Sequence, residues 1–100
     1  MYAANARVSS VKARQYLVQL CKHFSHKAPA TFDDNGGRIE LQPGLCLLAA
    51  TANELIVTCE AETVAQLDLV KRIVADHIVR FGWRDTIEIS WVDGRPPVTS

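Results

Sequence analysis

The sequence is poor in the residues that mark specialised classes of protein. Its five glycines and four prolines are scattered among turns, so it has no low-complexity segment, internal repeat or interdomain linker. Its three cysteines form no CxxC pair, which argues for reduced, buried thiols rather than a disulfide framework. The longest apolar run, residues 45–50, is far too short to span a bilayer, and no signal-like segment opens the chain. We therefore expect a soluble, cytoplasmic protein.

Acidic residues are absent from the first third of the chain. Residues 1–32 carry five Lys or Arg and no Asp or Glu, whereas residues 33–100 carry eleven acids and six cations. The formal net charge of zero therefore conceals a basic first third and an acidic remainder. A basic segment can bind nucleic acid, but the near-neutral isoelectric point and the lack of a recognisable reading motif argue against that function.

The chain does contain regular strand and helix patterns. One hundred residues suffice for one domain, which we place at residues 1–92, followed by a flexible tail at residues 93–100. A 3.6-residue periodicity predicts one helix ending near Lys27 and a second ending near Phe81. Alternation of apolar and polar residues predicts six strands, at residues 4–9, 30–32, 38–41, 45–50, 54–60 and 86–92.

The element order is β-α-β-β-β-β-α-β. Because hairpins join antiparallel neighbours, we expect an α+β fold, a two-layer sandwich in which a mainly antiparallel sheet carries both helices on one face. The capping candidates are Ser9 or Ser10 for the first helix, and Thr63 with Gln66 for the second. The open sheet face is polar enough to be wet and apolar enough to dimerise, with Arg38, Glu40, Leu47, Ala49, Ile56 and Thr58.

Turn chemistry predicts the strand pairing. Pro43 and Gly44 suit the centre of a type II turn, which would place Leu41 opposite Cys46 and Ile39 opposite Leu48. A symmetric loop near residues 52–53 places Cys46 directly across from Cys59 on the core face. This cysteine pair would be a redox switch or, as buried thiols usually are, two small apolar side chains.

Several segments resemble one bacterial family. The segments 19-QLCKHFSHK-27, 37-GRIE-40, 44-GLC-46 and 76-DHIVRFGWR-84 are together similar to domain of unknown function family 2218. The resemblance spans nearly the whole chain up to Trp91. It implies relatives beside, or fused to, flavin-binding siderophore-interacting reductases, and hence a link to iron acquisition. A reductase of this kind or a ferric siderophore is therefore an expected partner.

Histidines at the edges of the two helical stripes form the main candidate site. If the helices lie side by side on the sheet, His23 and His77 face one another, with Tyr16 and Lys27 nearby. Such a patch can bind an anion, a carboxylate or a siderophore-bound metal, or transfer protons near neutral pH. Ordinary hydrogen bonds would also satisfy two such histidines. The candidate ligand-binding residues are Tyr16, His23, His26, Lys27, His77 and Arg84.

Metal and catalytic sites are less well supported. Cys21, His23 and His26 have suitable ligand atoms, but Cys21 faces the core and His26 points nearly the opposite way on a helix. No Ser/His/Asp spacing, carboxylate pair or phosphate loop is present, so we assign no catalytic residue, metal or cofactor.

Three functions remain open at this point. The first is a binding or accessory module in iron–siderophore metabolism. The alternatives are a homo-oligomerisation or protein-interaction domain that uses the open sheet face, and a small metal-dependent enzyme.

Overall fold

The computed structural model describes residues 1–81 and 89–94, without the side chain of Phe81. It contains the predicted order of elements and confirms the α+β fold. The elements are β1 (Tyr2–Ser9), α1 (Ala13–Phe24), β2 (Ala30–Phe32), β3 (Gly37–Glu40), β4 (Leu45–Ala50), β5 (Glu54–Ala61), α2 (Val64–Phe81) and β6 (Val92–Asp93).

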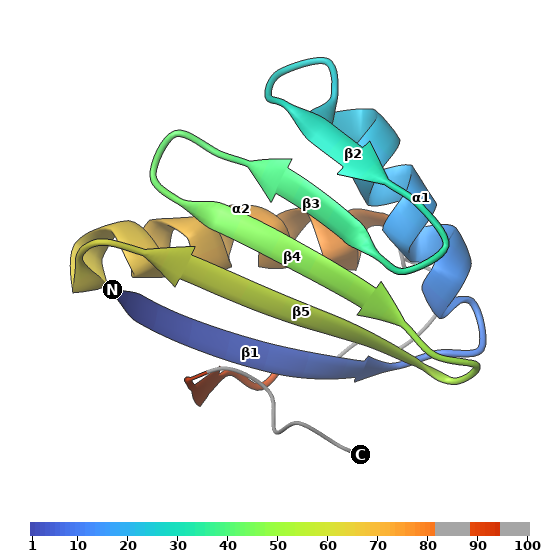
Figure 1. Cartoon of the computed structure of the whole chain (residues 1–100). Coiled ribbons are helices and arrows are strands. Elements are labelled where there is room, and N and C mark those ends of the chain that lie inside the picture. The colour runs from blue at the N-terminus through green and yellow to red at the C-terminus, as the bar shows by residue number, and fades with distance from the viewer. Residues whose placement is uncertain (82–88, 95–100) are drawn as a thin grey trace.

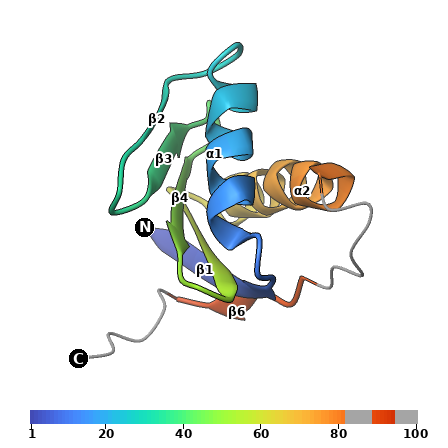
Figure 2. The same ribbon diagram turned by 90° about the vertical axis from the view of Figure 1, so that its right-hand side faces the viewer.

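The fold has two layers. The strands form one sheet in the order β2-β3-β4-β5-β1-β6, and every pairing between them is antiparallel. Both helices lie behind this sheet in Figure 1, and the side view in Figure 2 places them on the same face. The core therefore fills the space between the sheet and the helices. Its largest fully buried side chains are Leu17, Leu20, Ile39, Leu55, Ile78, Val8, Val57, Val70, Val74, Cys21, Cys46 and Cys59.

Helix α1 is shorter than predicted at its C-terminal end. The predicted cap at Ser9 or Ser10 is wrong, because the N-cap residue is Lys12 and no side chain caps the helix. The Ser10 hydroxyl instead accepts a hydrogen bond from the Lys12 N–H, before the helix begins. The helix ends at Phe24 rather than near Lys27. The Ser25 N–H still donates to the Cys21 carbonyl, four residues back, but His26 and Lys27 donate three residues back, to the His23 and Phe24 carbonyls. His26 and Lys27 therefore lie on a tight turn after the helix.

Helix α2 follows its sequence signals closely. The Thr63 Oγ1 accepts the Gln66 N–H at 3.1 Å, as expected for an N-cap. The buried stripe begins with Leu67 and Val70 and continues to Ile78. Among the described residues, no helix is long and apolar enough to cross a membrane.

The predicted register between β3 and β4 is wrong by two residues. Leu41 and Gly44 exchange backbone hydrogen bonds, so Gln42 and Pro43 form the loop. Gly44 lacks the positive φ of a type II turn, and it is instead a close-packing residue, because a Cβ there would overlap the Glu60 carbonyl oxygen.

The corrected pairing joins Ile39 to Cys46 and Gly37 to Leu48. Leu41 is therefore not opposite Cys46, and Ile39 is not opposite Leu48. A shift of two residues keeps every side chain on its face of the sheet, so the predicted core positions survive this error. On the other side of β4, Cys46 pairs with Cys59, as predicted.

The last strand is also shorter than predicted. Only residues 92–93 pair with β1, residues 89–91 are not in a strand, and residues 86–88 lie outside the described part of the chain. Ile89 and Trp91 still pack partly against the core. Their alternation therefore reflects burial rather than strand pairing.

The sheet extends past the domain boundary predicted at residue 92. Asp93 lies in β6, and the Gly94 N–H donates to the Ala3 carbonyl at 2.7 Å. The Asn5 side chain, which is buried, donates to the Gly94 carbonyl at 2.8 Å. The rest of the predicted tail, residues 95–100, lies outside the described residues.

Candidate functional site

Two imidazole rings meet where α1 and α2 lie side by side. The ring centroids of His23 and His77 are 4.9 Å apart, with a 50° angle between the ring planes. Phe24 packs against both rings, at 4.5 Å from His77 and 5.7 Å from His23. Both histidines are half-buried. The juxtaposition that the helical stripes predicted is therefore present.

The orientation of His77 is fixed by its own helix. Its Nδ1 lies 2.7 Å from the carbonyl oxygen of Ile73, one turn earlier in α2. A carbonyl oxygen can only accept, so Nδ1 carries the proton and Nε2 is the atom that gains or loses one. The chemistry of this ring is thus concentrated at Nε2, on the side away from the Ile73 carbonyl.

Positive groups surround His23. Partial burial lowers its pKa below the ordinary value of 6.5, and the nearby positive charges of His77, Lys27, His26 and Arg80 lower it further. We call His23, His26, Lys27, His77 and Arg80 the basic edge.

The basic edge contains four of the six predicted ligand-binding residues. His26 and Lys27 are exposed on the turn after α1. Tyr16 is 6% exposed and belongs to the core cluster two turns before His23, so it adds little to the surface. Arg84 lies outside the described residues. Sequence reasoning missed Arg80, although its position three residues after His77 is the spacing that places two side chains on one helix edge.

Cys21 does not join this site. Its thiol is buried and donates weakly to the Thr31 carbonyl of β2 at 3.7 Å, whereas His26 is exposed. Burial raises the pKa of Cys21, so a ligating thiolate is disfavoured. Within the described ranges, no cluster of three or more His, Cys, Asp or Glu side chains could hold a metal ion.

The other two cysteines form a pair that is buried in the centre of the sheet. Cys46 and Cys59 are cross-strand partners, and both thiols are free. Their mutual hydrogen bond and burial raise the pKa of Cys46 well above its usual value. High pKa and burial make a thiol a poor nucleophile, which favours the packing role over the redox role.

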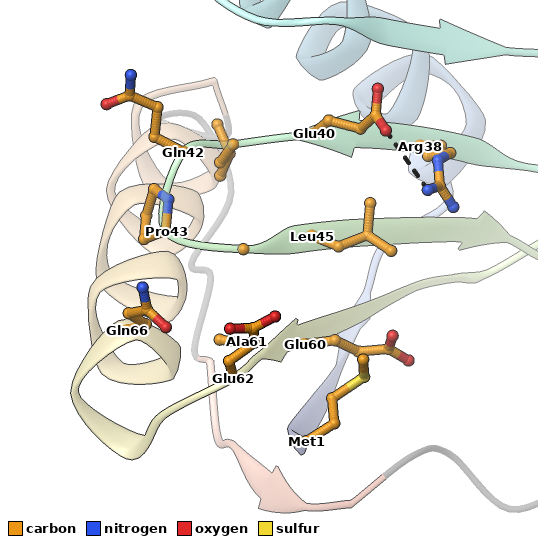
Figure 3. Close-up of a pocket in the computed structure, with 12 residues that line it drawn as sticks. Met1, Arg38, Glu40, Gln42, Pro43, Leu45, Glu60, Ala61, Glu62 and Gln66 are labelled. Carbon is orange, nitrogen blue, oxygen red and sulfur yellow. Dashed lines mark ion pairs between the residues drawn. The ribbon is translucent and has the colours of Figure 1, made fainter.

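A separate hollow of about 410 Å³ lies at the end of the sheet where the β3–β4 loop approaches the start of α2, and its lining runs from the uncovered sheet face to Gln66 (Figure 3). Leu45 and Pro43 contribute apolar surface, and Arg38 pairs with Glu40 at 3.5 Å. Glu60 is 7% exposed beside its cross-strand partner Leu45. We call this hollow the sheet-face pocket; its lining residues are Met1, Arg38, Glu40, Leu41, Gln42, Pro43, Gly44, Leu45, Glu60, Ala61, Glu62 and Gln66.

Comparison with known families identifies the group of proteins to which the chain is related. A bacterial family described as "Uncharacterized protein conserved in bacteria (DUF2218)" matches residues 5–92. The chain belongs to this family. Membership in family 2218 confirms the resemblance seen in the short sequence segments, and the match covers α1, the turn after it and α2, which together carry the basic edge.

A solved structure has the same fold. The NMR structure of PA4090 from Pseudomonas aeruginosa shares 26% of its residues with this chain, and the alignment covers 92% of this chain and 96% of PA4090, with a TM-score of 0.79. None of the curated proteins that were compared matches the sequence.

Proposed function

We propose that this member of family 2218 is a small binding module that takes an anionic ligand at the basic edge. The observation that carries the proposal is the His23–His77 ring contact at 4.9 Å. The basic side chains near His23, which include His77 and Lys27, disfavour its protonation. An anion bound between α1 and α2 would offset that repulsion.

The finer part of the proposal concerns the ligand. Ferric complexes of carboxylate and catecholate siderophores are anions, and the family resemblance links such proteins to siderophore-interacting flavoproteins. We therefore propose a ferric siderophore, or a reductase that carries one, as the partner in the cytoplasm. Three free, buried thiols fit a reducing compartment.

The proposal is tested by titrating the ¹⁵N-labelled protein with a gallium-loaded siderophore, which is a diamagnetic substitute for the ferric complex. We expect amide shifts centred on His23, Lys27 and His77. The double variant His23→Ala/Lys27→Ala should keep a folded spectrum and bind at least about tenfold more weakly, since it loses charged contacts worth 1.4 kcal/mol or more.

The matched control removes two cations from the other end of α1, in the double variant Lys12→Ala/Arg14→Ala. Its binding should stay close to that of the wild type. Equal affinity in wild type and His23→Ala/Lys27→Ala would show that the basic edge is not the binding surface.

The open sheet face supports a second candidate function, homo-oligomerisation. Leu47 and Ala49 of β4 and Ile56 of β5 lie on this face and are only half-buried. A second copy of the chain would cover this apolar patch. Sedimentation should then show a dimer that Ile56→Asp disrupts, and a monomer at every protein concentration would exclude it. Nothing among the described residues favours the metal-dependent enzyme.

A further inference from the structure

We propose that anion binding at the basic edge is coupled to uptake of one proton by the His23–His77 pair. The edge would capture an oxyanion, such as a carboxylate or sulfate, in mildly acidic solution and release it as the pH rises. This inference rests on the proposed function, because the coupling requires an anion at this edge.

The first step of the argument is the location of the proton. The Nδ1 of His77 faces the Ile73 carbonyl at 2.7 Å and therefore keeps its hydrogen whether the ring is neutral or charged. Protonation at Nε2 would turn an acceptor into a second donor. The neutral ring offers an anion no N–H at that atom, whereas the charged ring offers one together with a full positive charge.

The second step is the contact between the two rings. At a centroid separation of 4.9 Å, a positive charge on one ring disfavours a positive charge on the other. We therefore expect a bound anion to stabilise one added proton on the pair, and not two. Phe24, which packs against both rings, excludes water from part of this contact.

The third step is the charge around the pair. His26 and Lys27, on the turn after α1, and Arg80, on α2, lie near His23, and all three oppose its protonation. Lys22 precedes His23 in the chain, and Asp76, an exposed acid, precedes His77. A bound oxyanion would reverse the balance, since its negative charge stabilises an imidazolium that the surrounding cations destabilise.

The consequence is a linkage between ligand and proton. If binding raises the pKa of the pair, the dissociation constant must increase with pH across the interval between the free and bound pKa values. For one coupled proton the limit is about a tenfold loss of affinity per pH unit, which corresponds to about 1.4 kcal/mol.

The test measures Kd for sodium sulfate and for sodium acetate between about pH 6 and pH 8, the interval in which an ordinary histidine titrates. Neither anion titrates there, so the protein alone supplies any pH dependence. The readout is the ¹⁵N resonances of the histidine rings in the full chain, which report binding and protonation together. We expect affinity to fall by up to about tenfold per pH unit and the ring pKa to rise with ligand.

Three variants test whether His23 and His77 carry the pH dependence of anion binding. His23→Lys keeps a permanent charge at the half-buried edge, so it should bind sulfate with little dependence on pH. The double variant His23→Gln/His77→Gln should lose both the dependence and most of the affinity. Lys12→Ala/Arg14→Ala removes two cations at the other end of α1, outside the basic edge, and should retain the wild-type dependence.

The outcomes separate the two proposals. If neither anion binds near these rings at any pH, the simple oxyanion site and its proton coupling are both overturned. If sulfate binds with a constant Kd across the pH range, the binding site stands and the coupling is wrong. A dependence on pH that survives in His23→Gln/His77→Gln would also overturn the coupling, because another group would then carry the proton. Preference for acetate over sulfate would support a carboxylate ligand, and the reverse a tetrahedral oxyanion.

Discussion

The basic edge and the sheet-face pocket differ in how charge is distributed among their side chains. In the sheet-face pocket, Arg38 lies 3.5 Å from Glu40, so opposite charges partly cancel within β3. At the basic edge, the basic side chains near His23, which include His77 and Lys27, each oppose its protonation. Cancelled charge is common on protein surfaces and contributes little, whereas accumulated like charge has a cost that a ligand can relieve. The edge is therefore the better candidate for function.

The two regions also differ in how tightly their backbones are held. The sheet-face pocket is bordered by Gly44, at which a Cβ would overlap the Glu60 carbonyl oxygen and approach Val70 to 3.0 Å. The basic edge ends in the exposed turn of His26 and Lys27. Changes at the pocket border should thus alter stability, and changes at the edge should alter binding.

The largest expected effect is a loss of stability at the border of the sheet-face pocket. Gly44→Ala forces β4 away from β5 and should lower the free energy of unfolding by about 2–3 kcal/mol, as overpacking typically does. Urea unfolding followed by circular dichroism measures this loss. Gly37→Ala is the matched control, since its Cβ would meet the Cys21 and Leu17 side chains rather than backbone and should cost less. An unchanged midpoint for Gly44→Ala would contradict the close packing.

The next largest effect concerns the pKa of His23 and anion binding at the basic edge. Inverting two cations in Lys27→Glu/Arg80→Glu should raise the pKa of His23, because both residues now hold it down, and should weaken sulfate binding by about tenfold or more. An NMR titration of the His23 ring gives the pKa directly. Lys71 lies elsewhere on α2, in an ion pair with Asp68. The control variant Lys71→Glu should therefore leave the pKa of His23 and the affinity for sulfate unchanged. A His23 pKa that falls in the double variant would refute the charge assignment.

The smallest effect concerns the pH dependence of stability. The pKa of His23 is lowered in the folded state, so the unfolded chain takes up the proton first as the pH falls below about 6.5. The stability linked to this ring is complete above that pH and decreases as the pH falls through the folded-state pKa. Urea midpoints at about pH 7.5 and pH 5.5 should therefore differ less in His23→Gln than in the wild type. Equal differences in both proteins would show that His23 makes no such contribution.

The sequence predicted local structure well where one pattern dominated. Helix α2 has a strong cap at Thr63 and an apolar stripe that continues to Ile78, and its predicted limits are correct. The pairing of Cys46 with Cys59 also follows from a short loop between adjacent strands. These features depend on residues close in sequence, for which periodicity and turn chemistry are sufficient.

The errors occurred where distant segments compete with local signals. Pro43 and Gly44 have the sequence pattern of a type II turn. In the structure, however, Gly44 packs closely against β5 and α2, and the loop lies one residue earlier than predicted. Ile89 and Trp91 alternate like strand residues, yet they pack against the core without pairing to β1.

The sequence by itself determined the order of the elements, the two-layer α+β fold and the placement of His23 and His77 at the edges of apolar stripes, because these follow from periodicity along one segment. Only the tertiary structure decided that the two rings meet at 4.9 Å, that Arg80 joins them and that Tyr16 is withdrawn into the core. The physical reason is that the distance between two helix edges depends on how both helices pack on one sheet. No local pattern in either helix contains that information.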